Sequence, residues 1–233
     1  GRGLAPTRPL QHAQVGLVAE LASPLGASLA ALGQVLLRLL ELGPPTVEIR
    51  FDRRHPLRDS RHRDEHTQTV QLSDIPRFSK LGVIPSMQPT HCISDKLYYE
   101  LRVGYERCKG TYAWRSLIDA GSRLAFGTDY QVEPLNPMEG LYAAVSRKDR
   151  LGEEGEGWFP EQKLTMEEAI KYYTLGSAYA QFMDDRKGMI KPGYLADIVI
   201  TGKDLLTIPE NEIMTTKVDY TIVGGRIVFE SGK

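Results

Sequence analysis

The feature that most constrains the fold is a repeated order of short apolar segments, each followed by a polar side chain and a helix-forming stretch. From residue 61 onward, three strand-like segments end at His66, His91 and Asp129, and the last of them, Leu124–Asp129, closes in a small-residue turn. Strands that alternate with helices predict parallel pairing in one sheet. Because parallel strands place their carboxyl ends on one edge, the three polar side chains are expected on the side where barrel enzymes carry out catalysis.

Helix signals separate these three segments. Ser73 is expected to cap a helix that runs through Leu81, with Pro76 in its first turn and Gly82 at its end. A second helix is expected over Ala113–Ala120. Together with the strands, they predict the order βαβαβ.

The region after Asp129 predicts more helix. One helix is expected over Met138–Val145, followed by a polar loop over residues 147–157 whose length is typical of a functional or mobile segment. Thr165 and Glu168 then form the pattern of a capping box at the start of another helix.

The end of the chain has a different pattern. A strand is expected over Ala196–Ile200, and Val218–Val223 with Arg226–Phe229 predicts a hairpin around the two-glycine turn Gly224-Gly225. These strands predict a small β layer separate from the parallel sheet.

Three regions are therefore predicted. Residues 1–60 show no regular alternation and contain one expected helix, Ala27–Leu42; residues 61–187 carry the strand and helix units; residues 188–233 carry the β layer. The apolar helix is interrupted by charges and is shorter than the roughly 20 residues that cross a bilayer. No secretory signal pattern is found, so a cytoplasmic protein without membrane attachment is expected.

Composition limits the classes of partner. The chain has 29 Lys and Arg against 30 Asp and Glu, so no overall charge favours nucleic acid or an anionic membrane. Two cysteines are too few for a disulfide framework, which suits a reducing compartment. A small-molecule substrate is the expected partner.

Histidine and aspartate are side chains that bind divalent metals and transfer protons. Three of them at strand ends therefore indicate a metal-assisted site at His66, His91 and Asp129. Each also has a structural interpretation: His66 could cap or pack, His91 could hold a loop, and Asp129 could cap the segment that follows it.

Several strings of residues occur together in the order found in one known family. They are Glu65-His66, Gln88-Pro89-Thr90-His91, Ala113-Trp114-Arg115-Ser116-Leu117, Phe126-Gly127-Thr128-Asp129, Val132-Glu133-Pro134-Leu135-Asn136-Pro137 and the tail from Gly188 to Asp197. From about Arg61 to its end, the chain resembles the C-terminal part of amidohydrolase-superfamily enzymes of the amidohydrolase 3 branch. The resemblance implies an α/β fold: the C-terminal half of a metal-dependent (β/α)8 (TIM) barrel hydrolase, with strands of a small β-sandwich domain.

The same resemblance implies hydrolysis of carbon–nitrogen bonds other than peptide bonds, with an amide or formamide as substrate. Zinc is the metal it implies. His66 matches a metal ligand, Asp129 matches the aspartate that contacts both metal and water, and His91 matches a histidine that contacts substrate. In such a site the metal lowers the pKa of water toward roughly 7, Asp129 transfers its proton, and His91 hydrogen-bonds the carbonyl oxygen.

The chain also departs from the family pattern. It has no His-x-His pair upstream of His66, and His12-Ala13 matches only part of the motif that contains the strand-five histidine in the family. We therefore expect an incomplete, truncated enzyme whose remaining ligands come from elsewhere. The alternative is a noncatalytic remnant that acts as an interaction module, and unpaired strand edges would favour a homo-oligomer in that case.

Overall fold

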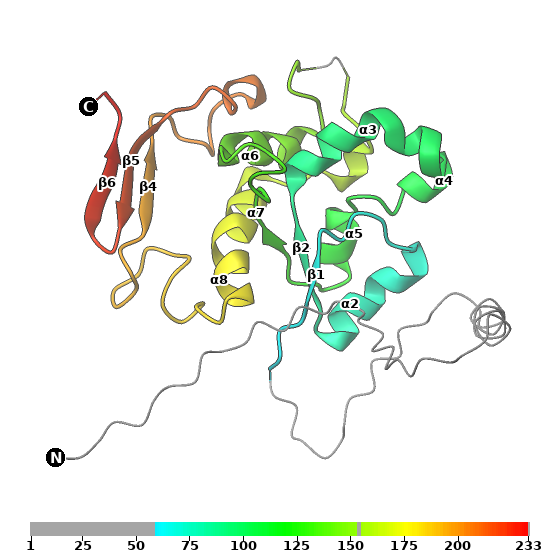
Figure 1. Cartoon of the computed structure of the whole chain (residues 1–233), viewed down its shortest axis with the longest axis horizontal. Coiled ribbons are helices and arrows are strands. Elements are labelled where there is room, and N and C mark those ends of the chain that lie inside the picture. Colours follow the sequence, from blue (N-terminus) through cyan, green and yellow to red (C-terminus); the bar gives the residue numbers. More distant parts are fainter. Residues whose placement is uncertain (1–58, 153–154, 233) are drawn as a thin grey trace, which may run out of the picture. The chain divides into compact units, whose positions relative to one another are not determined.

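The computed structural model describes residues 59–152 and 155–232, and expectations for residues 1–58, including the helix at Ala27–Leu42 and His12, lie outside them. Three short strands form a parallel sheet (Figure 1). They are β1 (Arg63–Glu65), β2 (Ile84–Met87) and β3 (Ala125–Phe126), in the order β1-β2-β3. Glu65 pairs with Ser86 and Met87 with Phe126, which confirms the parallel order predicted from the sequence.

Helix α2 (Ile75–Leu81) follows β1 and ends at Gly82 in a left-handed conformation, as expected. The expected cap at Ser73 is wrong. A short 3-10 turn, η1 (Leu72–Asp74), precedes the helix, and Asp74 takes the cap position without a side-chain cap hydrogen bond. The carboxylate of Asp74 instead accepts a hydrogen bond from Arg77 Nη1 at 2.9 Å and accepts none from the first amides of the helix.

The second strand is shorter than expected, because β2 ends at Met87 and a helix begins at Pro89. Helix α3 (Pro89–Val103) has its proline in the first turn, a position that helices favour. His91 therefore lies in the first turn of a helix and not at the end of a strand. Helices α4 (Tyr105–Cys108) and α5 (Trp114–Asp119) complete the connection to β3.

The remaining helices follow β3. They are α6 (Pro137–Ser146), the 3-10 turn η2 (Pro160–Gln162), α7 (Met166–Lys171), the π-helical segment η3 (Tyr172–Gly176) and α8 (Ser177–Ala180). The capping box at the start of α7 is confirmed: Thr165 Oγ1 accepts from the Glu168 amide, and Glu168 accepts from the Thr165 amide. Both η3 and α8 contact β3.

The core forms where these helices meet the sheet. Trp114 and Leu117 on α5, Phe126 on β3, and Leu141 on α6 are all buried in one apolar cluster. The Phe126 ring meets the rings of Trp114 and Tyr172 edge-on, an arrangement that aromatic pairs favour. This packing fixes the position of β3.

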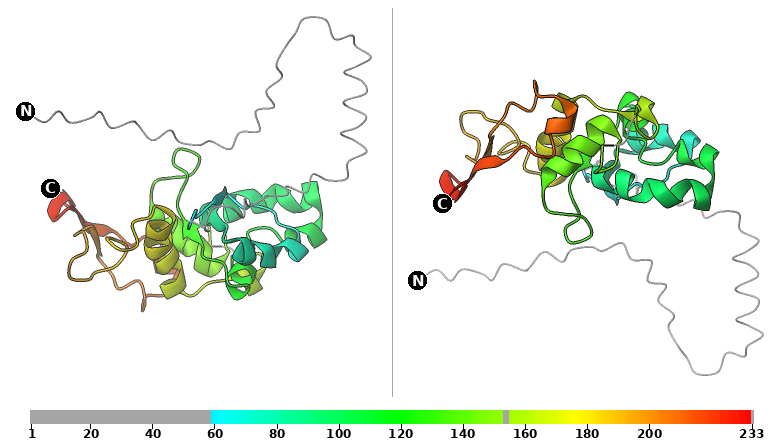
Figure 2. Two further views of the ribbon diagram at one scale, coloured as in Figure 1. Left: turned by 90° about the horizontal axis from the view of Figure 1, so that it is seen from below. Right: turned by 90° about the horizontal axis from the view of Figure 1, so that it is seen from above.

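The C-terminal strands form a second sheet, drawn orange to red in Figures 1 and 2. Strands β4 (Ile198–Thr201), β5 (Val218–Val223) and β6 (Arg226–Glu230) are antiparallel, in the order β4-β5-β6. A 3-10 turn, η4 (Glu210–Glu212), lies between β4 and β5. The expected hairpin is confirmed, with its turn at Gly224 and Gly225, both at positive φ.

Candidate functional site

Two of the three predicted side chains meet beyond the carboxyl ends of the parallel strands. His66 directly follows β1, and Asp129 lies three residues after β3. His66 Nδ1 lies 3.9 Å from Asp129 Oδ2. It also lies 3.0 Å from Oε1 of Gln88, the residue between β2 and α3. The sheet thus brings together residues that are far apart in the sequence.

Both residues adopt an uncommon backbone conformation. His66 has a φ of 75° and Asp129 a φ of 53°, in the left-handed region that side chains other than glycine rarely enter. Residues held in this region cost about 1–3 kcal/mol each and tend to occur at functional sites. The Asp129 carbonyl accepts the Val132 amide at 2.7 Å, which closes a tight turn around the aspartate. The backbone at both positions is therefore strained, and contacts elsewhere in the fold must maintain it.

His91 lies beside this pair. Its ring centroid is 5.8 Å from that of His66, and its residue is 6% exposed. Within the described residues, neither ring nitrogen of His91 has a hydrogen-bond partner. Burial lowers the pKa of His91, which favours the neutral imidazole. A buried ring with two unsatisfied nitrogens is costly, so it marks a position where a bound molecule would be stabilised.

The described residues do not by themselves supply a complete metal cage. In residues 59–152 and 155–232, no three His, Cys, Asp or Glu side chains are grouped so that they could hold a metal ion. His66 and Asp129 provide one nitrogen and one carboxylate donor, a combination that suits a divalent metal. A metal at this position would need further ligands besides these two.

A polar network near the start of α3 was not found from the sequence. Asp95 accepts hydrogen bonds from the hydroxyls of Tyr98 and Tyr112 and from Gln68 Nε2, the last at 3.2 Å. The bond to Asp95 raises the pKa of Tyr98 to about 12, and burial together with Asp95 raises that of Tyr112. This network fixes α3 one turn beyond His91. Its only sequence signal is the presence of polar residues at helical spacing.

The expected polar loop begins with a buried residue. Arg147 is fully buried; it donates to the Tyr112 carbonyl at 3.0 Å and to the Trp158 carbonyl, and its guanidinium lies over the Trp114 ring at 4.5 Å. Burial lowers its pKa. The Trp158 amide in turn donates to the Arg147 carbonyl at 2.9 Å. Arg147 therefore closes the base of the loop, a role that its position in a polar stretch does not reveal.

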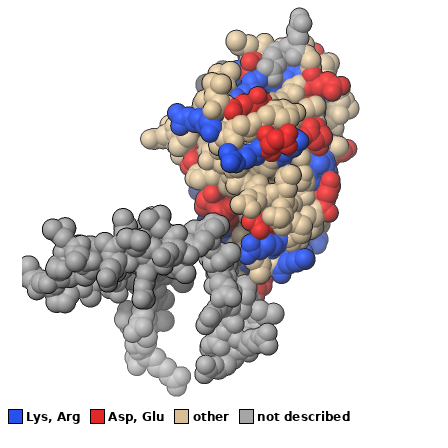
Figure 3. Space-filling view, turned by 90° about the vertical axis from the view of Figure 1, so that its right-hand side faces the viewer, with Lys and Arg blue, Asp and Glu red and all other residues tan. Residues whose placement is uncertain are grey.

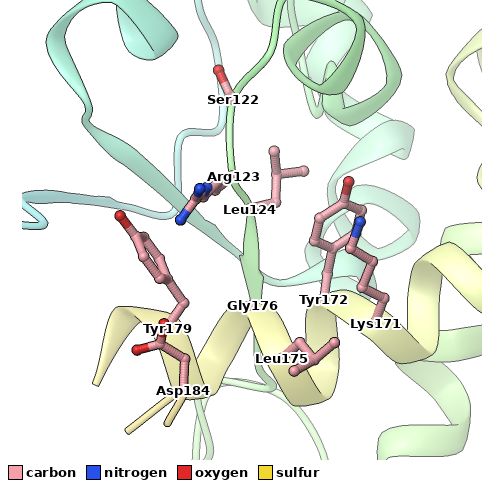
Figure 4. A pocket seen from close by; sticks show the side chains of 9 residues that line it. All are labelled: Ser122, Arg123, Leu124, Lys171, Tyr172, Leu175, Gly176, Tyr179 and Asp184. Carbon is pink, nitrogen blue, oxygen red and sulfur yellow. The ribbon is translucent and has the colours of Figure 1, made fainter. Parts of the chain in front are cut away.

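A separate pocket of about 310 Å³ lies at the opposite end of β3 (Figure 4). Its walls include Arg123 and Leu124, which precede the strand, and Tyr172 and Tyr179 on the helical segments. A second hollow, of about 580 Å³, lies between α3 and Trp158. Neither includes His66, His91 or Asp129.

The surface carries no large area of one charge on the face shown in Figure 3, where basic and acidic side chains alternate. This distribution agrees with the balanced composition of 29 basic and 30 acidic residues. Among the described residues, no helix is long and apolar enough to cross a membrane.

Comparison with known proteins decides the family. The profile of the amidohydrolase family matches residues 40–229. This chain belongs to the amidohydrolase family. Among curated amidohydrolase relatives, it is 32% identical over 178 residues to the putative amidohydrolase YtcJ of Bacillus subtilis, covering 76% of this chain and 34% of that protein. It is 31% identical to the protein LONG AFTER FAR-RED 3 of Arabidopsis thaliana, over 74% of this chain and 29% of that protein. It is 25% identical to the N-substituted formamide deformylase of Arthrobacter pascens, over 91% of this chain and 38% of that protein.

Solved structures with a similar fold also match. A metal-dependent hydrolase from Pyrococcus horikoshii matches with a TM-score of 0.57 at 31% identity, over 65% of this chain and 31% of that chain. Atrazine chlorohydrolase from Arthrobacter aurescens, solved with zinc, matches in fold with a TM-score of 0.50 at 24% identity, over 72% and 36%. The chain spans about a third of the length of these curated relatives, with shares of 34%, 29% and 38%.

Proposed function

We propose that this chain carries one part of a metal-dependent amidohydrolase site that cleaves a carbon–nitrogen bond other than a peptide bond, such as an amide or formamide. The observation that carries the proposal is the meeting of His66 and Asp129, 3.9 Å apart beyond parallel strands, next to the buried ring of His91. Membership of the amidohydrolase family supports it. The relative whose name states a reaction on a formamide supports the substrate class.

In this proposal, residues 61–187 form the C-terminal part of a (β/α)8 barrel, and residues 188–233 contribute strands to a β-sandwich domain. The parallel sheet β1-β2-β3 and the antiparallel sheet β4-β5-β6 support this division. Residues 1–60 are the N-terminal region in this division. The partner is a small-molecule substrate.

His66 and Asp129 would hold a divalent metal, with zinc as our proposed ion, together with ligands from outside the described residues. The zinc-bound structure of the similar fold supports this choice. When bound, such a metal acts as a Lewis acid and lowers the pKa of the water bound to it toward about 7.

The protein's own groups carry the proton and orient the substrate. Asp129 accepts a proton from the attacking water and delivers it to the leaving nitrogen, so that water is added across the carbon–nitrogen bond. His91, neutral because burial lowers its pKa, donates one ring N–H to the carbonyl oxygen as negative charge develops there. The second unsatisfied nitrogen of His91 remains available as an acceptor.

The first test is elemental analysis of the purified, monodisperse protein. We expect near-stoichiometric zinc, lost in His66→Ala and retained in His62→Ala, a matched control because His62 is an exposed histidine four residues earlier. Metal that persists in His66→Ala would contradict the ligand assignment. A folded protein without metal would favour the noncatalytic alternative.

The second test concerns Asp129. In a preparation that hydrolyses N-substituted formamides or amides, Asp129→Ala should abolish turnover while the circular dichroism spectrum and the unfolding midpoint stay close to those of the wild type. Retained turnover would remove Asp129 from the mechanism.

A further inference from the structure

The loop after β3 has an inverted exposure pattern. Val132 and Leu135 are 70% and 67% exposed, whereas Glu133 between them is only 7% exposed. A loop normally turns its charge outward, because a buried carboxylate loses its hydration and must be compensated by hydrogen bonds or ion pairs. Glu133 is therefore held in place by specific partners.

Both carboxylate oxygens of Glu133 are engaged. Oε1 accepts the Ser94 hydroxyl at 2.6 Å, and Oε2 accepts Arg150 Nη2 at 2.7 Å. Arg150 also donates through Nε to Glu139, in the first turn of α6, at 2.6 Å. A single buried carboxylate thus joins the loop after β3, helix α3 and the segment after α6.

These contacts relate directly to the candidate site. Ser94 lies on α3 three residues after His91, one turn along the same helix face. On the other side, Asp129 begins the tight turn that ends at Val132, immediately before Glu133. The chain from Asp129 to Glu133 is therefore a short connection between the proposed proton-transfer group and the helix that carries His91.

The conformation of Asp129 makes such an anchor useful. Its left-handed φ of 53° is unfavourable, so the turn would relax if its far end were free. The neighbouring side chains Val132 and Leu135 are exposed and contribute little packing. Polar contacts, rather than apolar burial, hold this loop.

We propose that Glu133 is a positioning residue: through Ser94 and Arg150 it fixes the loop after β3 against α3 and so holds Asp129 opposite His66 and His91. Its importance for turnover rests on the proposed function. Its effect on the position of Asp129 does not.

The first experiment measures amide hydrogen exchange on the wild-type chain and on Glu133→Gln, a variant of the same shape without the charge. We expect exchange in residues 127–136 to rise by about 10- to 100-fold, because hydrogen bonds to a charged group are lost in a locally opening segment. Exchange in α7, η3 and α8 should not change. Glu168→Gln is the matched control, since it removes a carboxylate that pairs with Arg115 away from this loop. Unchanged exchange in residues 127–136, or a rise equal to that in Glu168→Gln, would overturn the proposal.

The second experiment uses a preparation that turns over substrate. Glu133→Gln should lower kcat by about tenfold or more, with KM within about twofold, because misplacement of a catalytic group slows the chemical step. Glu133→Asp, which keeps the charge, should recover part of kcat, as a purely steric role would not allow. An unchanged kcat with a loosened loop would overturn the positioning role. If the wild type itself shows no turnover, the proposed function fails, and the exchange result alone decides whether Glu133 anchors Asp129.

Discussion

Gly176, where η3 meets α8, provides a sharp test of how the helices pack on the sheet. Its backbone is helical, with φ −60° and ψ −47°, so alanine meets no conformational barrier there. A Cβ at this position would lie 2.2 Å from the Leu124 carbonyl oxygen, 1.2 Å short of the 3.4 Å at which ordinary contact begins. That oxygen belongs to the backbone immediately before β3, so it cannot rotate away.

Two opposing effects determine the stability of Gly176→Ala. Alanine is favoured over glycine in a helix by about 1 kcal/mol. Overpacking against a fixed neighbour costs about 1–3 kcal/mol, and a clash with backbone lies at the upper end because a whole helix must move. We expect a net loss of about 1–2 kcal/mol in the free energy of unfolding, although propensity alone predicts a gain of about 1 kcal/mol.

Urea denaturation monitored by circular dichroism measures this difference. The matched control is Gly127→Ala, because Gly127 has no atom within 4 Å of the added Cβ and no positive φ. The control should stay within about 1 kcal/mol of the wild type. If Gly176→Ala were as stable as the wild type or more stable, with an unchanged m value, the close approach of the end of η3 to the residue before β3 would be wrong.

Three further predictions follow from the described contacts. Thr165→Ala should lower the free energy of unfolding by about 1 kcal/mol in urea denaturation, because it removes the side-chain half of the α7 capping box. Arg115 lowers the pKa of Glu168, so the ion pair stabilises the fold above the ordinary pKa of glutamate, and this contribution is lost as the pH falls through the lowered pKa. The difference in unfolding free energy between the wild type and Glu168→Gln should therefore disappear in acid. A difference that stays constant down to acid unfolding would contradict this prediction. Cys92 and Cys108 form no disulfide and are buried, and burial raises the pKa of Cys108. A thiol reagent should therefore label neither cysteine until urea unfolds the chain, and fast labelling of the native protein would contradict their burial.

The sequence predicted the elements that depend on local chemistry. Gly82 ends α2, Thr165 and Glu168 cap α7, and Gly224-Gly225 turns the last hairpin, because each depends on a few neighbouring residues with special backbone or capping properties. The alternation of strands and helices also predicted the parallel sheet. Family membership, expected from the ordered strings around His66 and Asp129, is confirmed by the match over residues 40–229.

Helix α3 shows where local reasoning was insufficient. Pro89 suggested an extended approach to His91, yet proline is equally suited to the first turn of a helix, and here it opens one. Leu97 and Leu101, at helical spacing, are exposed, so the usual amphipathic pattern does not correspond to burial in this helix. The surrounding packing, rather than the string Gln88-Pro89, decides where β2 ends.

Sequence alone therefore predicted the family, the alternation of strands and helices, and the candidate site residues His66, His91 and Asp129. Only the tertiary structure decided their relations: the 3.9 Å approach of His66 to Asp129, the burial of His91 without partners, and the burial of Glu133 in a loop. The physical reason is the range of the interactions. Caps and turns are set by residues a few positions apart, whereas burial and distance depend on strands and helices that pack together from distant parts of the chain.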